Sequence, residues 1–164
     1  MNIVLVGFMG AGKTTVGRML AARLGYRFLD IDDCIEREQG CRVADLFERK
    51  GQAWFRKQET DVLKRLTKVQ NMVVATGGGL LTTPGNAELL KRIGICIHLT
   101  ASVEKLYERT ARTDNRPLLK TANPYATMAE LYEKRKDLYK MADITIDTES
   151  LYPSKTAGEI IKKL

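Results

Sequence analysis

A glycine-rich segment between an apolar run and an amphipathic run is the feature that most constrains this fold. Residues 7–14 read Gly-Phe-Met-Gly-Ala-Gly-Lys-Thr and fit the pattern G-x-x-x-x-G-K-[ST]. The preceding run, Asn2–Val6, is short and continuously apolar, as in a strand buried on both faces. The following run, Lys13–Leu24, has helical spacing, with one apolar face made of Val16, Met19, Leu20 and Leu24. Strand, loop and helix in this order predict an α/β fold.

The residue types of the loop are those that bind phosphate. Glycines let the backbone curl so that successive N–H groups point inward, beside the positive end of the following helix. Lys13 can reach the β- and γ-phosphates, and the Thr14 hydroxyl is a hard oxygen ligand suited to Mg²⁺. The chain has no N-K-x-D segment of the kind that reads guanine. We therefore expect ATP and Mg²⁺ as cofactors.

The remainder of the chain repeats the alternation of strand and helix. Further short apolar runs are Arg27–Leu29, Met72–Ala75, Ile93–Leu99 and Asp143–Ile146. Helical stretches are expected after Thr83-Pro84, an N-cap followed by proline, and over Ser102–Arg109 and Ala126–Tyr139. This alternation predicts a doubly wound parallel sheet covered by helices. With 164 residues, 44% of them hydrophobic, we expect one domain spanning residues 1–164.

Residues 110–124 interrupt this rhythm. The segment is polar, contains Arg116-Pro117, and has neither helical nor strand period. Irregular segments of this length in compact domains are often lids over active sites, although a plain connection is the alternative. We expect a mobile lid here.

The charge balance favours an anionic small molecule as partner. The net charge is +7, but the basic residues are dispersed, and the longest basic run is Lys134-Arg135-Lys136. No aromatic and basic residues alternate as in RNA-binding segments, so we expect no nucleic-acid partner. No apolar run approaches the ~20 residues that a membrane helix needs. We expect a cytoplasmic protein without a membrane partner, and a monomer.

Two carboxylates follow the second predicted strand, in Leu29-Asp30-Ile31-Asp32. Open α/β sheets present ligand-binding residues at this end of their strands. Asp30 could hold a water on Mg²⁺, and Asp32 could orient an attacking hydroxyl toward the γ-phosphate. Either aspartate could instead cap the helix that we expect to begin at Asp33-Cys34.

Three glycines and several arginines complete the candidate site. The run Gly77–Gly79 follows a buried strand, and a turn without side chains can offer N–H groups to an anion. Arg56, Arg116 and Arg135 carry guanidinium groups of the kind that grip carboxylate or phosphate. Glu59, three residues after Arg56, could hold that arginine across one helical turn.

Taken in order, these motifs closely resemble the shikimate kinase family. They are Gly-x-x-Gly-x-Gly-Lys-Thr-Thr-x-Gly, Leu-Asp-x-Asp, Phe-Arg-x-x-Glu, Gly-Gly-Gly and Arg-Pro-Leu-Leu, and the resemblance runs from Asn2 to about Asp147. It implies ATP-dependent phosphorylation of the 3-hydroxyl of shikimate, on the way to chorismate and the aromatic amino acids. The implied fold is a P-loop three-layer α/β/α domain with a five-stranded parallel sheet, a helical substrate-binding segment at about 32–62 and a mobile lid.

The resemblance also implies a role for each site residue. The catalytic residues would be Lys13, Asp32 and Arg116, and Mg²⁺ would lie near Thr14 and, through water, Asp30. The nucleotide would contact Gly10, Ala11, Gly12, Lys13, Thr14, Thr15, Arg109 (packed on adenine) and Arg116 (on the lid). Shikimate would contact Asp32, Arg56, Gly77, Gly78, Gly79 and Arg135.

One stretch departs from the family pattern. Members often carry an arginine beside the adenine just after the last strand, where this chain has Thr-Glu-Ser-Leu-Tyr at 148–152. We therefore assign no side chain there to the base. Two alternatives remain: another small-molecule kinase, such as a gluconate kinase, which has less use for Arg56, Arg135 and the triple glycine, and a non-catalytic ATP-binding protein, which has no need of Lys13 or Asp32.

Overall fold

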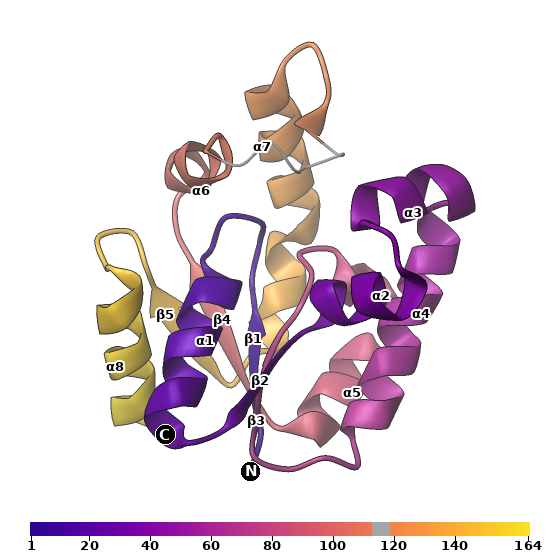
Figure 1. The fold of residues 1–164 in the computed structure, drawn as a ribbon. Coiled ribbons are helices and arrows are strands. Elements are labelled where there is room, and N and C mark those ends of the chain that lie inside the picture. Colours follow the sequence, from indigo (N-terminus) through magenta and orange to yellow (C-terminus); the bar gives the residue numbers. More distant parts are fainter. Residues whose placement is uncertain (113–118) are drawn as a thin grey trace.

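The computed structural model describes residues 1–112 and 119–164 and is built on a five-stranded parallel sheet. The strands are β1 (Ile3–Val6), β2 (Arg27–Asp30), β3 (Met72–Ala75), β4 (Ile95–Thr100) and β5 (Ile144–Asp147). Their order is β2-β3-β1-β4-β5, and every neighbouring pair is parallel (Figure 1). The five predicted strands and the doubly wound fold are confirmed, except that Ile93, expected in the fourth strand, is the last residue of a helix and β4 begins at Ile95.

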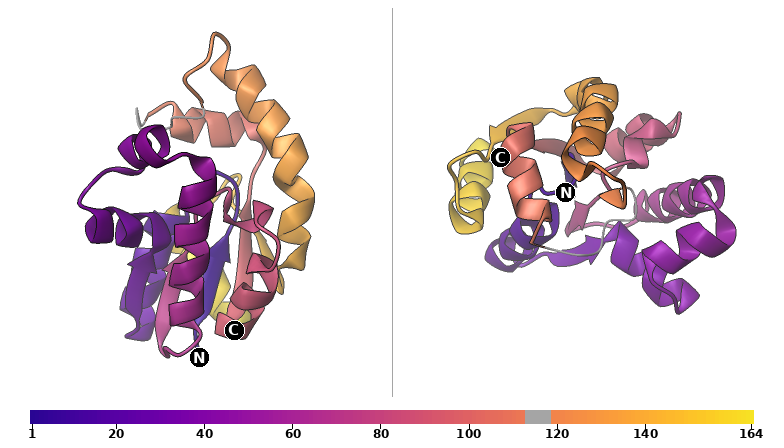
Figure 2. Two further views of the ribbon diagram at one scale, coloured as in Figure 1. Left: turned by 90° about the vertical axis from the view of Figure 1, so that its right-hand side faces the viewer. Right: turned by 90° about the horizontal axis from the view of Figure 1, so that it is seen from above.

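Helices cover both faces of the sheet and form three layers (Figure 2). One face packs against α1 (Lys13–Leu24) and α8 (Pro153–Lys163), which contact each other. On the opposite face lie α4 (Gln52–Leu66), α5 (Asn86–Ile93) and α7 (Pro124–Arg135), which continues into the 3₁₀ helix η3 (Lys136–Met141). Around the carboxyl ends of the strands lie α2 (Ile31–Gln39), α3 (Val43–Lys50), the 3₁₀ turn η1 (Leu80–Thr82) and α6 (Val103–Thr110).

Burial follows position in the sheet. All four residues of β1 and all four of β3 are buried, as continuous apolar runs predict for strands covered on both faces. The edge strand β2 has no fully buried residue, and β5 alternates exposed and covered positions. The edge strand β2 therefore gave a weaker sequence signal, since it pairs with one neighbouring strand and its residues are only partly covered.

Three predictions about helices are wrong in detail. Met19 is 39% exposed, so the buried face of α1 consists of Val16, Gly17, Leu20 and Ala21 instead. Helix α5 begins at Asn86 rather than after Thr83, because Thr83 closes the preceding 3₁₀ turn through its N–H to the Leu80 carbonyl. The stretch expected as one helix over Ala126–Tyr139 begins at Pro124, where Asn123 caps it, and changes to 3₁₀ geometry after Arg135.

The expected lid overlaps two helices at its ends. Thr110 is the buried last residue of α6, and Pro124 is the first residue of α7. Residues 113–118, including Arg116, lie outside the described residues. Within the described ranges, no helix is both long and apolar enough to cross a membrane.

Candidate active site

The candidate site lies at the carboxyl edge of the sheet. Because all five strands are parallel, the segments that follow β1, β2, β3, β4 and β5 meet at this edge. They supply the glycine-rich loop, the Asp30–Asp32 pair, the Gly77–Gly79 turn, the start of α6 and the segment after Asp147. The right-hand view of Figure 2 looks onto this edge.

The glycine-rich loop has the backbone geometry that its sequence predicts. Gly10 (φ 80°) and Gly12 (φ 90°) occupy the left-handed region, which side chains disfavour. A Cβ atom at Gly10 would lie 2.6 Å from the Leu106 carbonyl oxygen, so the loop also packs closely against α6. Buried Lys13 donates from Nζ to the carbonyl oxygens of Gly7 (2.7 Å) and Phe8 (3.0 Å), which holds the ammonium inside the curl of the loop.

Thr14 and Asp30 form a pair of hard oxygen donors beside this loop. The Thr14 hydroxyl donates to Asp30 Oδ2 at 2.6 Å. Asp30 Oδ1 accepts the backbone N–H groups of Asp32 (3.0 Å) and Asp33 (3.4 Å) and so caps α2, which begins at Ile31, two residues earlier than expected. Among the described residues no cluster of three or more His, Cys, Asp or Glu could hold a metal by itself. Two protein oxygens fit Mg²⁺, which takes its other ligands from phosphates and water.

A cavity of about 490 Å³ opens beside the loop. Its wall includes the expected nucleotide residues Gly10, Ala11, Gly12, Lys13, Thr14, Thr15 and Arg109. It also includes Thr148, Leu151, Pro153 and Thr156, to which the sequence analysis assigned no contact. These four residues follow β5 at the carboxyl edge, and that position was the available signal for them.

Arg109 is held by two hydrogen bonds to Thr148. Its Nη1 donates to Thr148 Oγ1 (3.0 Å) and its Nη2 donates to the Thr148 carbonyl oxygen (2.7 Å). The Thr148 hydroxyl in turn donates to the Thr100 carbonyl oxygen at the end of β4 (3.0 Å). Arg109 is thus held on the wall of this cavity by contacts within the protein.

A second cavity, of about 430 Å³, lies between the Gly77–Gly79 turn and helices α2, α3 and α4. Arg56 and Arg135, 79 positions apart in the sequence, both line it. The Arg56 Nη1 group pairs with Glu59 Oε2 at 2.7 Å, and the Glu59 side chain has no exposed surface. The predicted support of Arg56 by Glu59 is confirmed.

The two cavities meet at a shared set of residues, which are Thr14, Asp30, Asp32, Gly77 and Gly78. Asp32 therefore borders both the phosphate-binding side and the arginine side. Molecules bound in the two cavities would therefore adjoin at these residues. This arrangement suits transfer of a group from one ligand to another.

The three glycines have no positive φ, so what distinguishes their positions is the closeness of neighbouring atoms. A Cβ atom at Gly77 would lie 2.9 Å from Glu59 Oε1 and 3.0 Å from Asp32 Oδ1. At Gly78 it would lie 3.2 Å from the Met9 nitrogen, and at Gly79 it would overlap the Arg56 guanidinium. The turn therefore lets three charged side chains approach the backbone closely.

Burial shapes the charges of the second cavity. The pKa of Glu59 is raised to about 7, chiefly because burial disfavours the carboxylate, while Arg56 opposes the shift. The pKa of Arg135 is lowered by burial, with the Arg56 charge acting in the same direction. The lining of this cavity also includes Arg18, Arg42 and the carboxylates of Asp30, Asp32, Asp33 and Glu36. A bound anion would therefore pair locally with the Arg56 and Arg135 guanidinium groups.

The structure thus brings together every expected site residue that it describes. Arg116, expected on the lid, lies outside the described residues, so its position is a prediction only. The parallel sheet, the phosphate-binding loop with its lysine, and the adjoining acceptor cavity define a P-loop kinase.

Comparison with known proteins identifies the family. The family model described as "Shikimate kinase" matches residues 9–164. The shikimate kinase of Thermodesulfovibrio yellowstonii is 43% identical over 162 residues, covering 99% of this chain and 94% of the relative. That of Persephonella marina is 44% identical over 163 residues, covering 99% and 98%. This chain belongs to the shikimate kinase family.

Solved structures agree with this assignment. A shikimate kinase from Acinetobacter baumannii, solved in complex with shikimate, has a TM-score of 0.95 at 45% identity, covering 99% of this chain and 91% of that chain. A gluconokinase from Sinorhizobium meliloti has a TM-score of 0.57 at 16% identity, covering 98% and 89%. The second likeness shows the fold alone, so the gluconate alternative is not favoured.

Proposed function

We propose that this protein transfers the γ-phosphoryl group of ATP to the 3-hydroxyl of shikimate and produces shikimate 3-phosphate for chorismate and aromatic amino acid synthesis. The observation that carries the proposal is the junction of the two cavities at Asp32. One cavity has a phosphate-binding loop, and the other has two arginines suited to a carboxylate. Family membership then selects shikimate among anionic alcohols.

In the proposed complex, ATP occupies the first cavity. Its phosphates lie in the loop formed by Gly10, Ala11, Gly12, Lys13, Thr14 and Thr15, and Arg109 packs on the adenine. Thr14 Oγ1 and, through water, the Asp30 carboxylate would hold Mg²⁺, which neutralises charge on the phosphates when bound. The Lys13 ammonium offsets the negative charge that develops during transfer.

Shikimate occupies the second cavity with its carboxylate toward Arg56 and Arg135 and the Gly77–Gly79 turn. Its 3-hydroxyl then faces Asp32, which accepts a hydrogen bond from it and takes its proton as the hydroxyl oxygen bonds to phosphorus. The bond between the γ-phosphorus and the bridging oxygen breaks, and ADP leaves. Binding both ligands in adjoining cavities places the reacting groups close together, which lowers the entropic part of the barrier to transfer.

The acceptor is tested by measuring ADP release with shikimate, gluconate and nucleoside monophosphates side by side. We expect release that depends on shikimate alone, and a product whose phosphorus signal couples to the proton at C3. Arg56→Ala serves as a matched variant, because it should weaken turnover of shikimate and leave background ATP hydrolysis unchanged. Equal release with gluconate, or none with shikimate, would refute the proposal.

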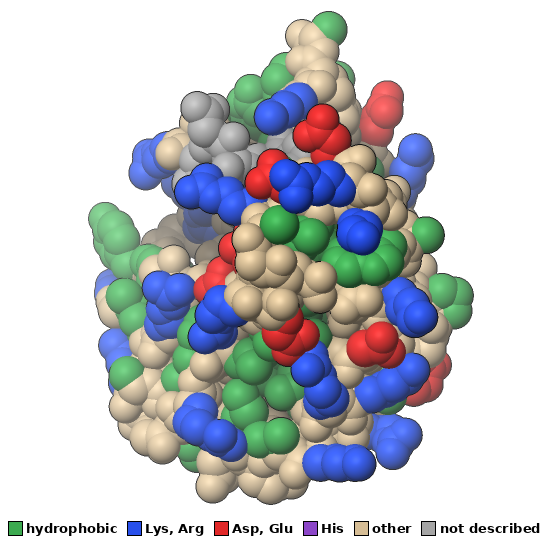
Figure 3. All heavy atoms as spheres, turned by 45° about the vertical axis from the view of Figure 1, so that its right-hand side comes forward, with side chains coloured by type: hydrophobic (Ala, Val, Ile, Leu, Met, Phe, Trp, Pro, Cys, Tyr) green, Lys and Arg blue, Asp and Glu red, His purple; other side chains and the backbone are tan. Residues whose placement is uncertain are grey.

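We also propose that the protein works as a cytoplasmic monomer. Figure 3 shows Lys and Arg side chains dispersed over one face among other residue types, without one continuous basic stripe. Such a surface supports a small anionic substrate rather than a nucleic acid as partner. Sedimentation at working concentrations tests the assembly state, and a mass of twice 18.4 kDa would refute a monomer.

A further inference from the structure

Tyr139 of η3 is buried behind the glycine turn, and both its ring and its hydroxyl are engaged. It is 2% exposed, and its hydroxyl donates to the Gly78 carbonyl oxygen at 2.8 Å. Its ring stacks on His98 with centroids 4.8 Å apart and planes 19° apart. Burial raises the pKa of the phenol above its usual value, so the hydroxyl keeps its proton and remains a donor.

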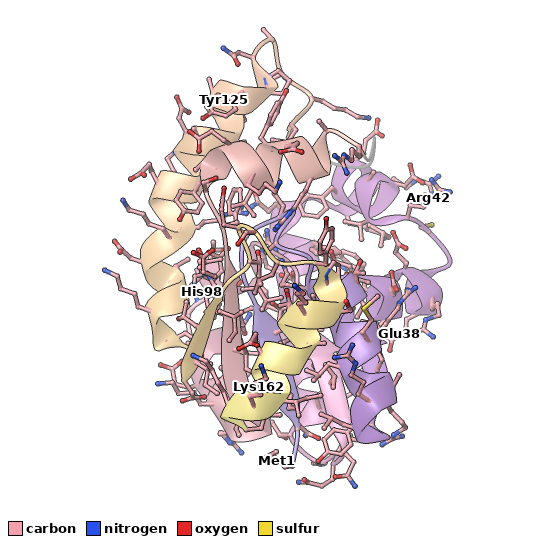
Figure 4. All side chains as sticks on the ribbon, turned by 90° about the vertical axis from the view of Figure 1, so that its left-hand side faces the viewer. Met1, Glu38, Arg42, His98, Tyr125 and Lys162 are labelled. Carbon is pink, nitrogen blue, oxygen red and sulfur yellow. The ribbon has the colours of Figure 1, made fainter. Side chains whose placement is uncertain are left out.

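The stack fixes the tyrosine ring to the sheet. His98 belongs to β4, and Figure 4 shows it on the side of the sheet where α7 runs. Burial, together with the Lys13 charge, lowers the pKa of His98 to about 4, so at neutral pH the imidazole is uncharged. Two neutral stacked rings form a rigid apolar contact, and β4 thereby sets the position of the Tyr139 hydroxyl.

The hydroxyl determines which way one peptide group points. In a trans peptide the C=O group and the following N–H group point in opposite directions, and no described peptide bond is cis. The Gly78 carbonyl points toward Tyr139, so the Gly79 N–H points the other way. Gly78 and Gly79 line the second cavity, whereas Tyr139 is not part of its lining. The Gly79 N–H is therefore directed to the cavity side of the turn.

Three consecutive glycines do not hold such a direction by themselves. Glycine has more backbone freedom than any other residue, so the peptide group between Gly78 and Gly79 could rotate at small cost. Neighbouring atoms approach both positions closely, and a stiff direction of this peptide group must come from a contact with such a neighbour. The hydrogen bond from Tyr139 is such a tether, and it starts four residues after Arg135, which lines the same cavity.

We propose that Tyr139 is a positioning residue for the acceptor substrate: its hydroxyl holds the Gly78 carbonyl so that the Gly79 N–H is aimed at the substrate carboxylate between Arg56 and Arg135. The inference rests on the proposed function, with shikimate as the acceptor. It gives the tyrosine a role in affinity for one substrate and none in the binding of the nucleotide.

The test compares Tyr139→Phe with Tyr132→Phe. The first change removes the hydroxyl that reaches Gly78 and keeps the ring. The second removes a hydroxyl from α7 at a ring that packs edge-on against Phe8. Tyr139→Phe should raise the KM for shikimate roughly three- to tenfold, as expected for one lost hydrogen bond, with the KM for ATP and kcat changed less than about twofold. Tyr132→Phe should match the wild type in all three values.

A shikimate analogue without the carboxylate separates positioning from general loosening. Wild type and Tyr139→Phe should bind this analogue equally, because it presents no group to the Gly79 N–H. A second variant, His98→Ala, keeps the hydroxyl and removes the stack, and it should also raise the KM for shikimate alone. His98→Phe should restore it.

An unchanged shikimate KM in Tyr139→Phe, or equal losses for shikimate and the analogue, would overturn the inference. If Tyr139→Phe does not fold, an unchanged shikimate KM in folded His98→Ala would overturn it as well. A wild type without shikimate-dependent turnover would instead refute the proposed function, so the two failures are distinguishable.

Discussion

Gly79 leaves no room for a side chain, because a Cβ atom there would overlap the guanidinium of Arg56. Gly79→Ala should therefore displace Arg56 from its pair with Glu59 and from the proposed carboxylate site. Loss of one charge-assisted hydrogen bond predicts a rise in the KM for shikimate of roughly tenfold or more, with the KM for ATP nearly unchanged. Steady-state kinetics with each substrate varied in turn measures both values.

Gly158→Ala is the matched control for this change. Gly158 lies in α8, and a Cβ atom there would meet only the Arg23 Nη1 atom at 3.5 Å, an ordinary contact. This control should keep wild-type kinetics. A Gly79→Ala protein with an unchanged shikimate KM would show that the Arg56 guanidinium does not need its place beside the turn.

Glu59 should give the enzyme a pH response near neutrality. Its pKa is about 7, and the charged groups around it are Arg56, Asp32 and Arg135. Below pH 7 the carboxyl becomes neutral and holds Arg56 less firmly, so kcat/KM for shikimate should rise between pH 6 and 8. Glu59→Gln should abolish this inflection. The one histidine, His98, has a pKa of about 4 and cannot supply it. An identical inflection in Glu59→Gln would exclude Glu59 as its source.

The same group should affect stability with the opposite sign. Because the folded-state pKa of Glu59 lies above its ordinary value of 4.5, the folded protein binds more protons than the unfolded chain between these values. Stability from this group is full below about pH 4.5 and is lost as pH rises to about 7, by on the order of 3 kcal/mol. Urea unfolding of wild type and Glu59→Gln at pH 5 and pH 8 measures the difference. A difference between the two proteins that does not change with pH would contradict the shift.

At the scale of elements, α2 shows how one residue can serve structure and function together. From its place in the sequence, Asp30 could either cap a helix or lie near Mg²⁺. In the structure Oδ1 caps α2 while Oδ2 accepts the Thr14 hydroxyl, so one carboxylate fits both roles. The sequence could not show that Asp30 fits both roles. Which oxygen contacts which partner depends on the orientation of the side chain at the end of β2, and residue type and spacing do not determine that orientation.

The hydrogen bonds between Arg109 of α6 and Thr148, which follows β5, predict an effect on nucleotide affinity. Thr148→Val removes the acceptor of the Arg109 Nη1 bond and keeps the shape of the side chain. Arg109 would then keep only its bond to the Thr148 carbonyl oxygen, and the KM for ATP should rise roughly three- to tenfold. Thr148→Ser preserves the hydroxyl and should keep the wild-type value. Calorimetric titration with ADP should likewise show weaker binding in Thr148→Val than in Thr148→Ser. Equal ADP affinity in both variants would show that the hydrogen bond from Arg109 to the Thr148 hydroxyl does not support nucleotide binding.

At the scale of the whole molecule, most of the sheet was predictable because β1, β3 and β4 are continuous apolar runs with glycine-rich or polar segments after them. The helical segment α2–α4 was implied by the family resemblance and not by periodicity. Its charged residues serve the second cavity and the surface, so its apolar positions are few. Thr148 and Thr156, which also line the first cavity, were not predicted. They reach this cavity because β5 lies next to β4 in the sheet, and the sequence does not show the order of the strands.

The sequence also does not show which residues of the site contact one another. Arg56 and Arg135 were identified one by one from their motifs, but the sequence could not show that Arg56 pairs with a fully buried glutamate or that Tyr139 bonds to the glycine turn. Those relations depend on contacts between elements up to 61 positions apart, such as that of Tyr139 with Gly78. The proposed phosphoryl transfer depends on the place where the two cavities join, at Asp32.

Replacement of Asp32 by asparagine tests that junction most directly. The measurement is single-turnover formation of shikimate 3-phosphate, with ATP and shikimate affinities determined by calorimetry on the same protein. Without a carboxylate to orient the hydroxyl and accept its proton, turnover should fall by roughly a hundredfold or more, while ATP affinity changes little. Loss of ATP binding with intact shikimate binding, or turnover close to that of the wild type, would contradict the account.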